Sequence, residues 1–166
     1  MTKPTFQQIT DAELQWIESQ LAAGKNFVAH YSSRHRDLSL EALDEAWTAW
    51  MATSQSDADE INHAINCIGI PFGSLLISTG EFAWCIASDD WGTDLAVRAL
   101  PDRGDVLVYP ADFVSKRWES RTTDFLVAAF PQIMEHVSQL RQKWVSTCRS
   151  NRAYAWVDEE NRVVRM

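Results

Sequence analysis

The chain has 166 residues, of which 46% are hydrophobic and 23% are charged. These values are typical of one folded domain and exclude a disordered chain. No run approaches 18 uninterrupted apolar residues, and the first ten residues lack the apolar core of a secretory signal. We therefore expect neither a membrane span nor export. Three widely spaced cysteines without a CxxC pair predict a reducing, cytoplasmic location.

The net charge of −8 comes from 23 acidic and 15 basic residues, and it is unevenly distributed. Residues 37–97 contain eleven acidic residues and no lysine or arginine. Such a stretch repels phosphate backbones, which argues against nucleic acid as a partner. It would attract a basic protein surface. A solvated surface that only serves solubility explains the same charges, so this alternative stays open.

Three helices are predicted in the first half of the chain. A capping box at Thr10 and Glu13 begins a helix over residues 11–23, and Gly24 is its predicted end. Ser39 caps the second helix, which carries an apolar stripe. The third begins at residue 56 or 57 and ends at Gly80. Two glycines four residues apart on that helix, at positions 69 and 73, predict the close approach of another element.

The hydrophobic period changes after Gly80. Short strands over residues 82–87, 94–99 and 106–109 are joined by tight turns, which predicts a three-stranded antiparallel meander. A short helix follows over residues 110–118, with proline at its first position. Thr122 or Thr123 is the predicted cap of a longer helix that continues to about Trp144. Residues 153–165 are predicted to form a terminal β-hairpin around an acidic turn.

This order of elements predicts the α+β class: N-terminal helices, an antiparallel meander, a long C-terminal helix and a hairpin. We expect a single domain over residues 1–166. Its parts are a helical segment over 1–55, a central segment over 57–131, and the C-terminal helix and hairpin over 132–166.

No catalytic motif is present. The sequence has no GxSxG elbow and no phosphate-binding loop, its histidines lack zinc-ligand spacing, and the acidic turn near Gly92 lacks the pattern of a calcium loop. We therefore predict no catalytic residue, no metal and no cofactor. The alternative is a dispersed site of a hydrolase or transferase that forms only in three dimensions, from His63, Asp89, Asp94 and Lys116.

Eight tryptophans are many for this length. Most are expected in the core, because each buries a large area. Trp16 lies off the apolar stripe of its helix and Trp91 lies in a turn, so these two are predicted to be exposed anchors for a partner. Together with acidic residues they form the predicted partner-binding set, which is Trp16, Asp44, Glu45, Asp57, Asp59, Glu60, Asp89, Asp90, Trp91 and Asp94.

Two segments carry a family resemblance. The first spans residues 70–98 and contains a Phe-Gly pair, a strand with Trp84, and the turn Asp-Trp-Gly-Thr-Asp-Leu-Ala from Asp90. The second spans residues 108–117 and reads Val-Tyr-Pro-Ala-Asp-Phe-Val-Ser-Lys-Arg. In this order they resemble DUF3806, a bacterial domain-of-unknown-function family, over residues 57–131. The resemblance implies a bacterial, cytoplasmic protein and no known activity. It is compatible with an immunity role beside a secreted toxin.

We expect a non-enzymatic protein that binds another protein, most specifically an immunity protein that occludes a basic toxin encoded nearby. The missing catalytic motif, the base-free acidic stretch and the tryptophans support this function. The alternatives are a structural or regulatory adaptor, with a homodimer through the helix of Trp47 and Trp50, and the dispersed hydrolase. Neither nucleic acid nor a membrane is expected as a partner.

Overall fold

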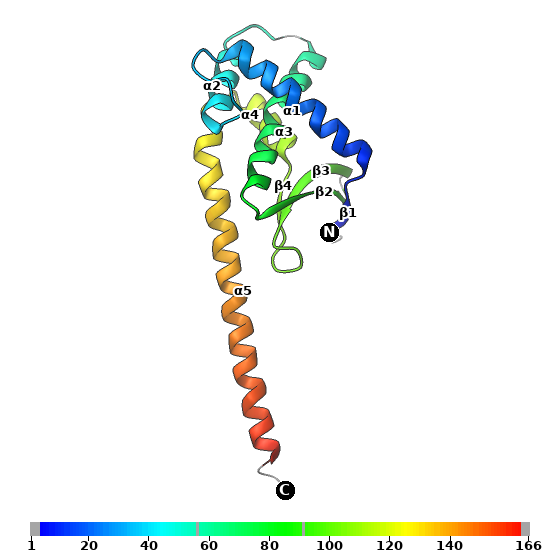
Figure 1. The fold of residues 1–166 in the computed structure, drawn as a ribbon, viewed down its shortest axis with the longest axis vertical. Coiled ribbons are helices and arrows are strands. Elements are labelled where there is room, and N and C mark those ends of the chain that lie inside the picture. Colours follow the sequence, from blue (N-terminus) through cyan, green and yellow to red (C-terminus); the bar gives the residue numbers. More distant parts are fainter. Residues whose placement is uncertain (1–3, 56, 91, 164–166) are drawn as a thin grey trace.

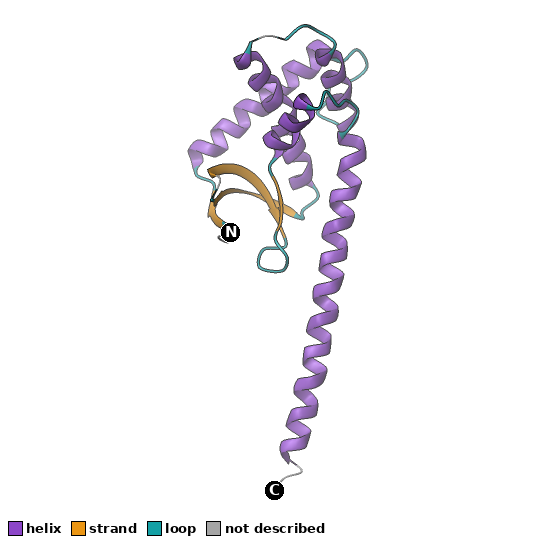
Figure 2. Ribbon diagram, turned by 180° about the vertical axis from the view of Figure 1, so that it is seen from behind, coloured by secondary structure: helices purple, strands orange, loops and turns teal. Residues whose placement is uncertain are grey.

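The computed structural model describes residues 4–55, 57–90 and 92–163, with side chains described as far as residue 147. It confirms the α+β class: helices pack over an antiparallel sheet, and a long helix ends the described chain (Figures 1 and 2). In chain order the elements are β1 (Thr5–Gln8), α1 (Asp11–Tyr31), α2 (Leu40–Met51), α3 (Ala58–Ser78), β2 (Phe82–Asp89), β3 (Gly92–Ala99), β4 (Val106–Val108), α4 (Pro110–Glu119) and α5 (Leu126–Val163).

Helix α1 is longer than predicted because Gly24 does not end it. A Cβ at Gly24 would lie 2.7 Å from Cγ of Pro71 and 2.8 Å from the carbonyl oxygen of Cys67. The glycine therefore lets α1 and α3 pack closely, and its prediction as a helix end was wrong. The predicted capping box of Thr10 and Glu13 is present.

The other predicted helix starts are also confirmed. Ser39 Oγ accepts a hydrogen bond from the backbone N–H of Ala42 at 3.2 Å. The Asp57 carboxylate accepts from the N–H groups of Asp59 and Glu60, at 2.7 and 3.4 Å. These caps satisfy backbone donors that a first helical turn leaves without a partner.

The close approach predicted at the two glycines of α3 occurs. A Cβ at Gly69 would lie 2.7 Å from the carbonyl oxygen of Pro110, and one at Gly73 would overlap the ring of Trp84. The first glycine brings the start of α4 onto α3, and the second brings β2 onto the same helix. Helix α3 thereby fixes α4 relative to the sheet.

The sheet has four strands in the order β1-β2-β3-β4, with every neighbouring pair antiparallel. Strands β2 to β4 are the predicted meander. Strand β1 was not predicted, and it pairs with β2 from Thr5 opposite Ser88 to Gln8 opposite Cys85. Its four residues contain one large apolar side chain, Phe6, which is too few to produce a period-two pattern.

Most buried side chains form one core between the helices and one face of the sheet. Trp47 and Trp50 belong to it and are 0% and 1% exposed. The homodimer predicted through the helix of these two tryptophans stays a prediction, and its contact would use other residues of α2, because neither ring reaches the surface. A smaller cluster lies on the opposite face of the sheet and consists of Cys85, Ala87 and Ala96, with Phe6, Leu107 and Tyr109 against it.

The C-terminal hairpin prediction was wrong, because α5 continues as one helix to Val163. After Pro131 the sequence contains neither glycine nor proline, so no residue interrupts the helix once it has formed. Figures 1 and 2 show its C-terminal part extending beyond the rest of the fold.

Helix α3 has the length and apolar composition of a membrane-spanning helix, with a mean hydropathy of 1.3 in its most apolar window. In this fold, 56% of that window is buried, and most buried apolar side chains of the helix pack in the main core. Among the described residues it is the one helix with these properties.

Candidate functional site

A polar pocket of about 520 Å³ lies where the β2–β3 turn meets α4. The β2–β3 hairpin supplies one wall and the beginning of α4 supplies the other. The two segments that carried the family resemblance are therefore brought together at this pocket. Its lining residues are Ala87, Asp89, Gly92, Thr93, Asp94, Tyr109, Asp112 and Lys116.

The strand register explains why the hairpin residues share one side. Ala87 pairs with Asp94, and Asp89 pairs with Gly92. Alternate residues of a strand point to the same face, so Ala87 and Asp89 share the face of Cys85, opposite the helical core. The turn itself is closed by the Gly92 N–H, which donates to Asp89 Oδ1 at 3.2 Å. Gly92 has a φ of 148°, a conformation that favours glycine.

Helix α4 brings the remaining charges to the pocket. Pro110 occupies its first turn, as predicted, and Asp112 and Lys116 lie four residues apart on one face of the helix. Their charged groups are 2.7 Å apart. Both side chains are largely solvent-exposed, so this ion pair contributes little stability and is available for exchange with another charged group.

The pocket has an acidic balance. Three carboxylates, those of Asp89, Asp94 and Asp112, line it together with one ammonium group, that of Lys116. Burial raises the pKa of the Tyr109 phenol, and the same three carboxylates raise it further. The phenol therefore keeps its proton at neutral pH and presents a hydrogen-bond donor. The arrangement suits a cationic group from outside, such as a guanidinium or ammonium ion.

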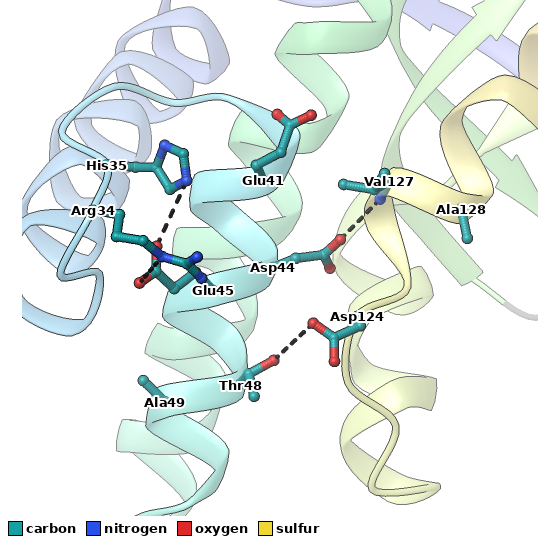
Figure 3. Close-up of a pocket in the computed structure, with 10 residues that line it drawn as sticks. All are labelled: Arg34, His35, Glu41, Asp44, Glu45, Thr48, Ala49, Asp124, Val127 and Ala128. Atoms are coloured by element: carbon teal, nitrogen blue, oxygen red, sulfur yellow. Dashed lines mark hydrogen bonds and ion pairs between the residues drawn. The ribbon is translucent and has the colours of Figure 1, made fainter.

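A larger pocket of about 680 Å³ lies between α2, the loop before it and the start of α5 (Figure 3). Two predicted partner-binding residues, Asp44 and Glu45, line it. Asp44 is only 4% exposed. Its carboxylate accepts backbone hydrogen bonds from Phe125, Leu126 and Val127, at 3.0, 2.9 and 2.9 Å. Asp44 is thus the cap of α5, and the predicted caps Thr122 and Thr123 were wrong.

Glu45 holds the loop that precedes α2. Its carboxylate accepts from Ser32 Oγ at 2.8 Å and from Ser33 Oγ at 3.0 Å, and it lies 3.4 Å from Arg34 Nε. These contacts, the Ser32 hydroxyl first, lower the pKa of Glu45 to about 2. Because Asp44 and Glu45 are engaged inside the fold, we assign this pocket a structural role.

The remaining predicted residues fall at separate places. Asp57, Asp59 and Glu60 lie at the beginning of α3, among the helices and away from the sheet (Figure 1). Trp16 is 42% exposed on α1. Asp90 is exposed in the β2–β3 turn beside the pocket. Trp91 lies outside the described residues.

Three members of the dispersed hydrolase set, Asp89, Asp94 and Lys116, line the polar pocket, but His63 does not. His63 Nε2 lies 3.4 Å from Sγ of Cys67 on α3. Burial raises the pKa of the Cys67 thiol to about 11, which keeps it protonated. Within the described part of the chain, no three His, Cys, Asp or Glu residues are placed to hold a metal ion.

Sequence reasoning missed Tyr109 and Asp112 as pocket residues. Both lie in the segment Tyr-Pro-Ala-Asp that carried the family resemblance, which was the available signal. Their position depends on the contact of Pro110 with Gly69, and that contact joins segments forty residues apart.

A family model described as "Domain of unknown function (DUF3806)" matches residues 44–130, slightly more than half of the chain. The match contains the whole polar pocket and begins at Asp44, earlier than the resemblance at residue 57 indicated. Neither the curated proteins nor the solved structures contain a match to this chain.

Proposed function

We propose that this chain, which belongs to the DUF3806 family, is a non-enzymatic protein that binds a basic protein partner. The polar pocket between the β2–β3 turn and α4 is the proposed contact site. A lysine or arginine of the partner would enter it and pair with the carboxylates there.

The observation that carries this proposal is the charge of the pocket. Three carboxylates against one ammonium group leave a net charge of about −2, which attracts a cation and opposes an anion. Asp94 and Asp112 both line the pocket, and a guanidinium group pairs well with carboxylates. Residues 37–97 contain no basic residue, and the resulting negative charge of the chain favours fast encounter with a basic partner.

The more specific form of the proposal is an immunity protein that acts in the cytoplasm and neutralises a basic toxin encoded nearby. Occlusion of a toxin needs a rigid surface and no catalytic residue. The close packing of β2 and α4 on α3, at Gly73 and Gly69, supports this form of the proposal. Trp16, exposed on α1, would be an additional anchor.

The predicted alternatives have less support. An adaptor that dimerises through helix α2 would have to use residues other than Trp47 and Trp50, whose rings are buried. The predicted hydrolase site needs His63 beside Asp89, Asp94 and Lys116, whereas His63 lies against Cys67 and does not line the pocket. The acidic residues at the start of α3, which include Asp59 and Glu60, remain a second predicted surface for contact with the partner.

The test is co-expression of this chain with the product of the adjacent gene, followed by affinity purification and a growth assay. We expect a stable complex and restored growth. A harmless neighbour, or a toxic neighbour that neither binds this chain nor is neutralised by it, would contradict the immunity role. A complex without any effect on growth would support partner binding and contradict the more specific form.

A further inference from the structure

Apart from the two pockets described above, a groove of about 560 Å³ lies between the edge of the sheet and α5. Its lining comes from residues 105–108 of the sheet, from Phe113 and Arg117 of α4, and from the face of α5 around Ile133 and His136. Figures 1 and 2 both show α5 passing beside the β4 edge. This groove is separate from the polar pocket, and the inference below does not rest on the proposed function.

The groove contains an open strand edge. Strand β4 is last in the sheet order and pairs with β3 alone. All three residues of β4 line the groove, together with Asp105 before the strand. Since neighbouring side chains of a strand point to opposite faces, three consecutive strand residues reach one groove only along the edge of the strand. Alternate residues direct their N–H and C=O groups away from β3. For the groups of Val106–Val108 that point away from β3, the described chain provides no backbone partner, whereas the N–H of Asp105, before the strand, donates to the carbonyl oxygen of Leu100 at 3.2 Å.

Arg117 gives the groove a charge. Arg117 is half-buried, and its guanidinium group stacks over the ring of Phe113, 4.2 Å from the centroid. None of the described carboxylates forms an ion pair with it. The carboxylate that lines this groove, on Asp105, is held by Arg98 at 2.6 Å. A ligand carboxylate would therefore find a positioned, uncompensated guanidinium group.

We propose that this groove binds an extended peptide segment of a partner protein, which adds a fifth strand to β4 and places an acidic side chain against Arg117. The open edge supplies backbone hydrogen bonds, and Phe113 and Ile133 supply apolar contacts for alternate side chains of the peptide. Edge-to-edge pairing of two copies would set two α5 helices and two Arg117 groups against each other, which favours a separate peptide as the occupant.

The experiment uses a displayed library of random peptides, selected for binding to the full chain. We expect the selected peptides to contain an acidic residue flanked by β-branched residues. Arg117→Met keeps the apolar stem over Phe113 and removes the charge, so it should weaken binding roughly tenfold, the loss typical of one charge-assisted hydrogen bond. Lys143→Met removes an exposed cation on α5 and should leave the affinity unchanged. Amide hydrogen exchange should slow in residues 106–108 when peptide is bound.

A variant of the peptide distinguishes lost binding from a folding defect of the Arg117 variant. Replacing the acidic residue of the selected peptide by glutamine should reduce its affinity for the unmodified protein by the same factor. The proposal is overturned if no peptide is enriched, if binding is indifferent to both substitutions, or if exchange slows elsewhere in the fold. Protection of β4 in a self-associated dimer without peptide would assign the groove to a second copy and would also overturn it.

Discussion

Asp44 joins two helices through one carboxylate. It projects from α2 and accepts hydrogen bonds from three backbone N–H groups at the start of α5. Burial raises the pKa of this carboxyl group, and the three backbone bonds oppose that rise. The partial positive charge of a helix N-terminus compensates a buried carboxylate in this position.

We expect Asp44→Ala to lower the free energy of unfolding by about 2–4 kcal/mol, because three donors at a buried helix start lose their acceptor. Urea denaturation measures this change. Glu41→Ala, an exposed change one turn earlier on α2, should cost less than about 1 kcal/mol. Equal losses in the two variants would show that the cap contributes no more than a surface charge.

Glu45 makes stability depend on pH. Its pKa is near 2 in the fold, below its ordinary value of 4.5, so its contribution is complete above about pH 5 and disappears as the pH falls towards 2. The difference in Tm between the unmodified protein and Glu45→Gln should therefore be largest near neutral pH and shrink in acid. Thermal unfolding followed by circular dichroism across this range provides the measurement. A difference that stays constant would contradict the role given to Glu45.

At the scale of elements, glycines on α3 decide where α4 and the sheet lie. Gly69 has no room for a methyl group, because the carbonyl oxygen of Pro110 occupies that space. This contact places the beginning of α4 opposite the β2–β3 turn. Asp112, in the first turn of α4, therefore faces the same pocket as the turn. The polar pocket therefore depends on a residue that does not line it.

Gly69→Ala should destabilise the fold by about 1–3 kcal/mol, because backbone atoms of α4 must move to admit the new methyl group. The chemical-denaturation midpoint reports the loss. Asn62→Ala, on the exposed side of α3, is the matched control, and it should be neutral or slightly stabilising. If Gly69→Ala also proves neutral, the tight packing between α3 and α4 is not what positions the pocket.

Local signals in the sequence predicted most elements and failed where a distant contact decides. The caps at Thr10, Ser39 and Asp57 lie within three residues of the groups they bind, so their patterns were readable. The cap of α5 is supplied by Asp44, eighty residues earlier, and no local pattern reveals it. In the sequence, a glycine that ends a helix cannot be distinguished from one that allows another helix to pack closely, as Gly24 does.

The candidate site was predictable in part for the same reason. Asp89 and Asp94 lie in one turn and were selected from it. Tyr109 and Asp112 join them only because α4 docks on α3. Asp44 and Glu45 belonged to the same acidic stretch, but the fold uses them internally, a distinction that charge counting does not make.

At the scale of the whole molecule, the two proposed binding sites differ in charge and in the type of ligand that they suit. The pocket beside the β2–β3 turn is acidic and suits a basic side chain, whereas the groove beside β4 presents Arg117 and an open strand edge. Helix α5 passes the second and extends beyond both (Figure 1). The two sites are lined by different residues, although both include residues of α4.

The central claim is that the acidic pocket holds a basic partner, and the most direct measurement is the affinity of the complex with the adjacent gene product. Isothermal titration would compare the unmodified protein with the double variant Asp94→Asn/Asp112→Asn and with the control Glu18→Gln/Glu135→Gln, which removes the same charge from other helix surfaces. We predict at least a tenfold loss in the pocket variant at low salt, a smaller loss at high salt, and little change in the control. Equal affinities for the pocket variant and the unmodified protein would contradict the account.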